Sequence, residues 1–431
     1  MRSLMKMKKT VVFLSVMASV LLAAAEFDIK VTSTSKTGVV KAGEKVTVSA
    51  VALCDGKPVP AGYTLRVQRW DDGKGVKNES LPAEKEYKTV LERNAPGWSY
   101  VTFNLLDKSQ KEIKSKNRVI RVGTGIVLDL DKIAPARKEP ADFDAFWNAA
   151  KAELAGVPLK VLEMKKVSAN RTHEFFDVKV ACAGPKPVSG YLSKPLDRSR
   201  KYPVILMLHG AGVVTSYKSN YPGAIAFNVN AHGILNGQPA KYYADLKNGA
   251  LKGYPLFNNG NRDKIYFRYM FLRVLRALEF LRTVPEWNGK DIIVSGSSQG
   301  GAQTVFAAGM DPSVTFAIAT VPAMADISGC LAPYKRNSGW PKPYRNTPKD
   351  SAKVSAWDYY DGVNFARRIK CRIYVSTGLI DTTCPPTAVH CLFNQIPSKE
   401  KSIEIHRDMG HVARNDNGWK AFRELCEKAA K

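Results

Sequence analysis

Apolar and polar residues alternate along the chain from residue 26 to about residue 130. In Lys45-Val-Thr-Val-Ser-Ala50 an apolar side chain stands at every second position, which is the period of a half-buried strand. Asp-Gly and Pro-Gly pairs separate such stretches and predict turns. We therefore expect a small all-β, immunoglobulin-like sandwich over residues 26–130. Its expected strands are Phe27–Thr34, Lys45–Ala52, Thr64–Asp71, Tyr87–Asn94, Ser99–Asp107 and Asn117–Leu128.

The pattern changes over residues 133–431, where apolar strand-like runs alternate with segments of helical period. The first helix is expected at 141–154, because Phe143, Phe146, Trp147, Ala150 and Leu154 share one face. Strands separated by helices predict a mostly parallel sheet covered on both faces. The expected strands are 175–182, 187–194, 203–209, 224–230, 290–295, 316–321, 371–377 and 401–406, with helices at Tyr269–Thr283, Pro386–Gln395 and Gly418–Ala430.

The N-terminus has the pattern of a signal peptide over residues 1–25. A basic segment precedes an apolar run from Thr10 to Leu22, and three alanines precede Glu26. The alternative is an uncleaved membrane anchor, but the run is short for a span. We expect cleavage and export to the periplasm or the cell exterior, without stable membrane insertion of the mature chain.

The distribution of charge and the spacing of the cysteines argue against two kinds of site, a nucleic-acid-binding surface and a zinc centre. The net charge is +26, but the basic residues are spread along all 431 positions. Nucleic-acid binding needs a localised basic stripe, so no nucleic acid is expected as a partner. Attraction to an acidic polysaccharide stays open. Cys371, Cys384, His390 and Cys391 cluster in the sequence, yet their spacing fits no common zinc site, so buried thiols near a sheet are expected instead.

The chemistry is indicated most clearly by Gly296-Ser-Ser298-Gln-Gly300, which follows the apolar run Ile292–Val294. A strand, Gly-x-Ser-x-Gly and a helix opening with small residues form the nucleophile elbow of α/β-hydrolases. We therefore expect an α/β-hydrolase fold over 133–431, with Ser298 as the nucleophile.

Three histidines follow Ser298, at 390, 406 and 411. In α/β-hydrolases the order along the chain is serine, acid, histidine. His390 lies within an expected helix and His406 ends an expected strand, whereas His411 follows Gly410 in the loop after the last strand. His411 is the predicted general base.

The acid that orients this base is predicted to be Asp381. It ends the strand-to-loop segment beginning at Arg372. Asp408 is too close to His411 in sequence for a separate acid loop, and Asp361 precedes the strand.

An oxyanion hole requires two backbone N–H groups. Gln299, directly after the nucleophile, and Ala211, in the loop His209-Gly-Ala211 after a strand, are the candidates. His209 is interpreted as a residue that organises this loop.

Several of these segments resemble the acetyl xylan esterase and cephalosporin C deacetylase family, carbohydrate esterase family seven. The similar segments are 269–302 with the elbow, Asp381-Thr-Thr-Cys-Pro-Pro386, Gly410-His411 and Asp-Phe-Asp-Ala-Phe-Trp at 142–147. The resemblance covers about residues 133–431. It implies deacetylation of acetylated xylo-oligosaccharides without metal or cofactor, often by an oligomer.

Two departures from the family pattern concern the oxyanion loop. Ala211 stands where members often carry tyrosine, and Asn230-Ala-His232-Gly233 stands where many have Arg-Gly-Gln-Gly. The local scaffold is therefore expected to differ. Aromatic residues in the segments 213–262 and 326–361 are expected to shape the pocket.

Other functions stay open at this point. On the same fold the chain could be a feruloyl-type esterase or an oligopeptidase, or a polysaccharide-binding protein with a vestigial hydrolase domain.

In the β-rich region, Trp70 and Trp98 could stack on sugar rings or pack in a core or an interface.

Overall fold

The computed structural model describes residues 25–115, 118–334, 336–344, 348 and 351–429. The predicted signal peptide therefore lies, apart from Ala25, outside the described residues. None of the helices in the described ranges is long and apolar enough to cross a membrane.

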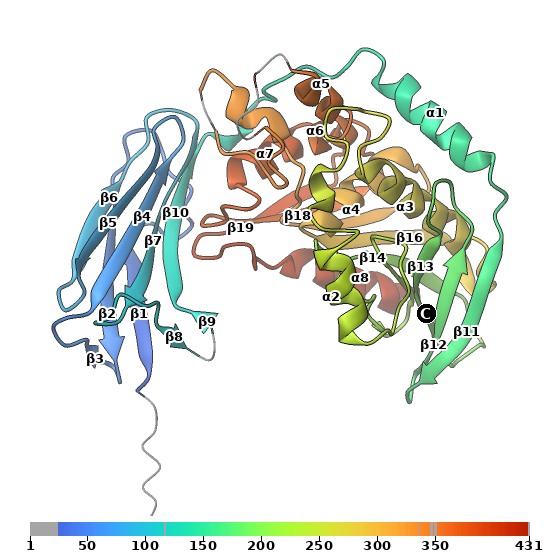
Figure 1. The fold of residues 1–431 in the computed structure, drawn as a ribbon, viewed down its shortest axis with the longest axis horizontal. Coiled ribbons are helices and arrows are strands. Elements are labelled where there is room, and N and C mark those ends of the chain that lie inside the picture. Colours follow the sequence, from blue (N-terminus) through green and yellow to red (C-terminus); the bar gives the residue numbers. More distant parts are fainter. Residues whose placement is uncertain (1–24, 116–117, 335, 345–347, 349–350, 430–431) are drawn as a thin grey trace, which may run out of the picture.

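The described strands of the N-terminal β region, residues 27–128, form two four-stranded antiparallel sheets packed face to face (Figure 1) and one short two-stranded sheet. Apolar side chains from both sheets, among them Ile29, Val48, Val67 and Phe103, form a shared core. One sheet contains β1 (Phe27–Ser33), β2 (Val46–Cys54), β3 (Lys57–Pro58) and β6 (Tyr87–Leu91). The other has the strand order β10 (Arg121–Leu128), β7 (Gly97–Leu106), β4 (Thr64–Asp71) and β5 (Gly75–Pro82). Separately, β8 (Lys114–Ser115) pairs with β9 (Arg118–Val119).

The rest of the chain is built on one large sheet, nine-stranded among the described residues. Its strand order is β11 (Val161–Ala169), β12 (His173–Val180), β13 (Val188–Pro195), β15 (Ile225–Val229), β14 (Tyr202–Leu208), β16 (Trp287–Ser297), β17 (Phe316–Thr320), β18 (Arg372–Gly378) and β19 (Lys401–His406). The pairings from β11 to β15 are antiparallel, and those from β15 to β19 are parallel. The parallel strands therefore end together at one carboxyl edge.

Helices cover both faces of this sheet, as alternate side chains of β14 demonstrate. Val204 and Leu206 belong to the main core with α1 (Phe143–Ala155), α3 (Phe267–Leu281) and α4 (Gln299–Met310). Ile205 points to the opposite face, where α8 (Asp416–Lys428) packs. The remaining helical elements are α2 (Ala240–Asn248), α5 (Ala352–Asp358), α6 (Gly362–Ala366), α7 (Pro386–Asn394), η1 (Leu130–Lys132), η2 (Tyr254–Leu256) and η3 (Ile327–Leu331).

The predicted fold class, an all-β region followed by an α/β-hydrolase fold, is confirmed. Four described strands were not predicted: the two-residue strands β3 and β8, and two longer strands, β5 and β11. Both lie at sheet edges and expose most of their side chains, so their sequences lack the apolar alternation of a half-buried strand. The last strand expected in the β region is divided at Ile120 into β9 and β10.

Helix α4 lies unusually close to the end of β14. A Cβ atom added to Gly300 would stand 1.9 Å from the carbonyl oxygen of Leu208, and one added to Gly296 would stand 2.4 Å from the same oxygen. Only glycine permits this approach of backbone to backbone. It brings the loop after β14 beside the first turn of α4.

We predict that Gly300→Ala lowers the free energy of unfolding by about 1–3 kcal/mol or more, because the methyl group forces α4 away from β14. Thermal unfolding followed by circular dichroism measures the loss. The matched control is Gly156→Ala at the C-terminus of α1, where the nearest atom would be 3.4 Å from the new Cβ. Equal stability of the two variants would refute the steric argument.

Candidate active site

Ser298 occupies the sharp turn between β16 and α4. Its backbone has φ 58° and ψ −119°, a combination that non-glycine residues rarely adopt. The surroundings hold it there: the Ser298 N–H donates to Thr320 O at 3.0 Å, and Ser298 O accepts from Ala302 and Ala323, each at 3.0 Å. Strain fixed in this way is typical of functional sites.

The structure brings Ser298, His411 and Asp381 together at the carboxyl edge of the sheet. His411 Nε2 lies 2.9 Å from Ser298 Oγ, and His411 Nδ1 lies 2.9 Å from Asp381 Oδ2. The Asp381 side chain is fully buried, whereas that of His411 is 34% exposed. Ser298 follows β16, Asp381 follows β18 and His411 follows β19. Each is therefore supplied by the loop after a parallel strand.

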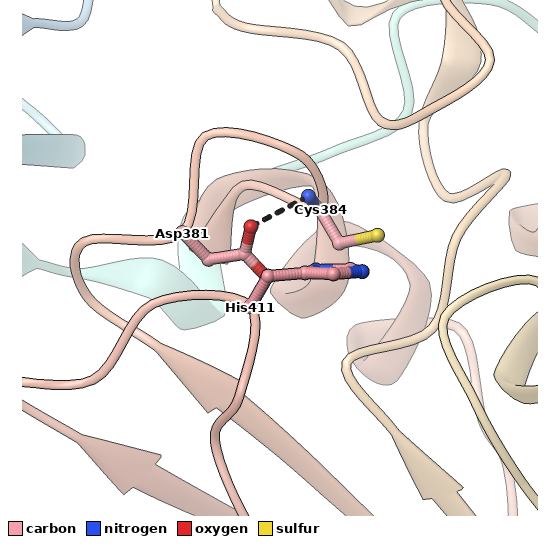
Figure 2. A group of neighbouring side chains, drawn as sticks. All are labelled: Asp381, Cys384 and His411. Carbon is pink, nitrogen blue, oxygen red and sulfur yellow. Dashed lines mark hydrogen bonds and ion pairs between the residues drawn. The ribbon is translucent and has the colours of Figure 1, made fainter. Parts of the chain in front are cut away.

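The carboxylate of Asp381 is held by its own loop. Its Oδ1 accepts the N–H groups of Thr383 at 2.8 Å and Cys384 at 3.0 Å. Because Oδ1 is occupied by these two donors, Oδ2 faces His411 (Figure 2). The contact fixes the imidazole in the tautomer that leaves Nε2 able to accept a proton from serine.

The other two histidines after Ser298 are engaged elsewhere. His390 is buried in α7, where its Nδ1 lies 2.9 Å from Pro386 O, and burial lowers its pKa to about 4. His406 Nε2 lies 3.0 Å from Arg414 O. Neither contact involves Ser298.

The two other acid candidates also have separate partners. Asp408 pairs with Arg407 at the surface. Asp361 is buried and caps α6, accepting the N–H groups of Val363 at 3.1 Å and Ile327 at 2.7 Å. Both carboxylates therefore have local structural partners, and His411 is paired with Asp381 instead.

The oxyanion candidates lie against the serine. Ala211 and Ser298 line one cavity with a volume of about 470 Å³, whose other lining residues are Gly210, Ser297, Trp340, Thr383 and His411. A Cβ on Gly210 would be 3.7 Å from the Cβ of Ser298. Gln299 is buried at the first turn of α4, and its side chain accepts a hydrogen bond from the Tyr254 hydroxyl at 2.6 Å.

His209 ties the loop after β14 to the segment at 230–233. Its Nε2 accepts the N–H of Ala231 at 3.3 Å, and its Nδ1 lies 2.9 Å from Gly210 O. This is the organising role expected from the sequence.

His232 also supports the loop after β14, a role that the sequence did not reveal. Burial lowers its pKa to about 4, so the ring is neutral at pH 7. Its Nε2 lies 3.0 Å from Gly212 O and its Nδ1 lies 2.8 Å from the Tyr266 hydroxyl. A carbonyl can only accept, so Nε2 donates to Gly212 and Nδ1 accepts from Tyr266. His232 thereby holds Gly212, the residue after Ala211. It belongs to Asn230-Ala-His232-Gly233, the segment that stands where many family members have Arg-Gly-Gln-Gly.

Asp381, Cys384 and His411 also form, within the described residues, a group that could hold a metal ion. One donor atom from each lies within 4.8 Å of the others (Figure 2). The imidazole, however, already bonds to the carboxylate through Nδ1 and to Ser298 through Nε2. Burial and the nearby Asp381 raise the pKa of the Cys384 thiol well above its usual value, and a protonated thiol is a poor ligand. The arrangement therefore fits a proton relay better than a metal centre.

Comparison with known proteins identifies the relatives of this chain. Residues 126–423 match the family described as acetyl xylan esterase. The chain belongs to the acetyl xylan esterase family. The resemblance inferred from the sequence is thus confirmed, and the family is one of carboxylic ester hydrolases, as predicted.

Individual relatives agree with this assignment. Acetyl esterase Axe7A of Xylanibacter ruminicola is 34% identical over 287 residues, which cover 63% of this chain and 63% of that protein. The chain thus aligns with less than two thirds of the length of this relative. An acetyl xylan esterase from a Paenibacillus species has a TM-score of 0.56 and 25% identity, over 69% of this chain and 98% of the other. Acetyl xylan esterase 1 from a Thermoanaerobacterium species has a TM-score of 0.57 and 23% identity, over 69% and 97%.

The family match begins near the end of the N-terminal β region, yet that region contacts two loops of the site. Trp98 Nε1 donates to Leu379 O at 2.7 Å, two residues before Asp381. The N–H of Gly125 donates to Arg407 O at 3.2 Å, and the Arg407 guanidinium contacts Ser35 O. The acid loop and the histidine loop of this esterase-family chain are therefore both fastened to the β region.

Trp98 is fully buried. Of the two roles that the sequence left open, stacking on a sugar ring and packing in a core or an interface, it has the second.

We predict that Trp98→Phe lowers the free energy of unfolding by about 1–3 kcal/mol, because the buried Leu379 carbonyl loses its partner. Chemical denaturation measures the change. Trp287→Phe is the matched control, since Trp287 is half-buried and its Nε1 donates over a longer 3.3 Å to Asp291 O. A loss as large in the control would contradict the prediction.

Proposed function

We propose that the protein is an exported carbohydrate esterase that removes acetyl groups from acetylated xylo-oligosaccharides or related glycans. The observation that carries the proposal is the hydrogen-bond chain from Ser298 through His411 to Asp381, with 2.9 Å at each step. The family name and the description of the relative Axe7A as an acetyl esterase support the substrate class.

In the proposed reaction, Ser298 Oγ attacks the acetyl carbonyl carbon while His411 Nε2 takes the hydroxyl proton. Asp381 keeps the imidazole oriented and stabilises its protonated form. The negative charge on the carbonyl oxygen is stabilised by the backbone N–H groups of Ala211 and Gln299. When the C–O bond to the sugar breaks, His411 returns the proton to the departing sugar oxygen, leaving an acetyl group on Ser298.

The second half of the reaction uses the same groups. A water molecule loses a proton to His411 and attacks the acetyl carbon. The bond to Ser298 Oγ then breaks, acetate leaves and the proton returns to the serine. No metal or cofactor is assigned a role in this sequence of steps.

We also propose that the chain divides at about residues 131–132. Residues 26–130 would form the β domain and residues 133–431 the catalytic domain, which is supported by the separate apolar core within the β sheets. Export is supported by the sequence pattern of residues 1–25 alone.

We predict that Ser298→Ala lowers the rate of acetate release by about 10⁴–10⁶, because the nucleophile is removed. Acetate release from p-nitrophenyl acetate and from acetylated xylo-oligosaccharides measures it. Wild-type turnover of a feruloyl ester or a peptide in place of the acetylated sugars would favour the other hydrolase classes. Equal rates for wild type and variant would rule out Ser298 as the nucleophile.

For the acid, we predict that Asp381→Asn lowers kcat by about 10⁴, because the amide no longer holds the correct imidazole tautomer. Asp408→Asn is the matched control. It removes a carboxylate that is nearer to His411 in the sequence but is paired with Arg407. Steady-state kinetics on p-nitrophenyl acetate compares the two. A larger loss in Asp408→Asn would reverse the assignment of the acid.

A further inference from the structure

A second, larger cavity lies between the N-terminal β region and residues of the segment 330–344. It has a volume of about 1140 Å³. The turn between β4 and β5 forms one wall with Trp70, Gly73 and Lys74, and residues around 330–344 form the other, with Leu256 at its edge. We call it the junction cavity.

The junction cavity lies next to the cavity that contains Ser298. Trp340 lines the Ser298 cavity, and the next two residues in the chain, Pro341 and Lys342, line the junction cavity. This segment is fixed in place, because Trp340 N donates to Thr383 O at 2.9 Å. Thr383 itself lines the Ser298 cavity. Consecutive residues of one segment, 340–342, therefore line first the Ser298 cavity and then the junction cavity.

The lining of the junction cavity suits a sugar chain. Trp70 is half-buried, and its orientation is fixed because Nε1 donates to Asp72 Oδ1 at 2.9 Å and the ring packs against Trp98. A fixed aromatic ring that is partly exposed provides a stacking face for a sugar. Asn337 also lines the cavity; its Oδ1 accepts from Lys342 Nζ at 3.2 Å, and its amide NH₂ group provides donors for sugar hydroxyls.

The basic side chains of the lining already have partners in the protein. Lys74 pairs with Asp71, Arg336 pairs with the buried Asp326, and Lys342 Nζ donates to Asn337 Oδ1 and Thr382 O. The cavity therefore suits a neutral sugar chain, which needs no charged partner.

We propose that the junction cavity binds sugar units of the same glycan chain whose acetyl group reacts at Ser298. The proposal rests on the proposed function, and it makes the β region part of the substrate-binding surface. Pockets for small ligands usually measure about 300–1000 Å³, so this volume holds more than one sugar unit. Binding is therefore expected to strengthen with chain length.

Calorimetric titration of the full-length Ser298→Ala protein with xylobiose and xylohexaose tests the proposal without requiring turnover. Xylohexaose is expected to bind at least tenfold more tightly than xylobiose. Adding Trp70→Ala is expected to weaken xylohexaose binding about tenfold through loss of the stacking face. Leu256→Trp, at another lining residue, narrows the cavity and is expected to weaken xylohexaose binding to a similar extent. Leu256 is 46% exposed, so this variant leaves the core intact.

Val76→Ala is the control, because Val76 is exposed on β5 beside the same turn but does not line the junction cavity. It is expected to bind xylohexaose like the parent protein. Equal affinity for the two sugars, or unchanged affinity in both cavity variants, would overturn the proposal. Acetate release by the wild type is measured separately, so failure of the esterase function and failure of this binding site give different results.

Discussion

The close contact between the first turn of α4 and the end of β14 is the constraint on which the site depends. Because Gly296 and Gly300 lack side chains, the Leu208 carbonyl lies directly against the helix. The loop containing Ala211 is then held beside Ser298, and Gln299 begins the helix at the same point. One backbone contact thus brings together the serine and both candidate oxyanion donors. Bulkier residues at either glycine would separate groups that must act on the same carbonyl.

Asp381 and His411 require a different kind of support, because both lie in loops. Each loop is fixed by a contact from the β region, Trp98 to the Leu379 carbonyl and Gly125 to the Arg407 carbonyl. The oxyanion loop is fixed within the α/β region by His232, which stays neutral at pH 7 and so keeps its donor on Nε2. Precise placement of catalytic loops on rigid neighbours is a general requirement of such sites.

The sequence predicted those parts of the fold and site that are encoded locally. The strand, Gly-x-Ser-x-Gly and helix around Ser298 occupy adjacent residues, and the periods of core strands and helices can be counted directly. The contact between Trp98 and Leu379 joins residues 281 positions apart, so no local pattern indicates it. The role of His232 likewise depends on Gly212 and Tyr266, which meet it only in the folded chain. Strands β5 and β11 lie at exposed edges, where burial imposes little pattern on the sequence.

The β region has its own apolar core, yet part of it also packs into the core of the α/β region. Trp98, Tyr100 and Val127 belong to the same apolar core as Trp147 and Phe306 of the α/β region. A tethered module would bury its apolar residues within itself and meet its neighbour through polar contacts. Here, separating the two parts would expose a fully buried tryptophan and leave the Leu379 carbonyl unpaired beside the acid loop. Removal of the β region would therefore take away a contact to the loop that carries Asp381 and one to the loop that carries His411.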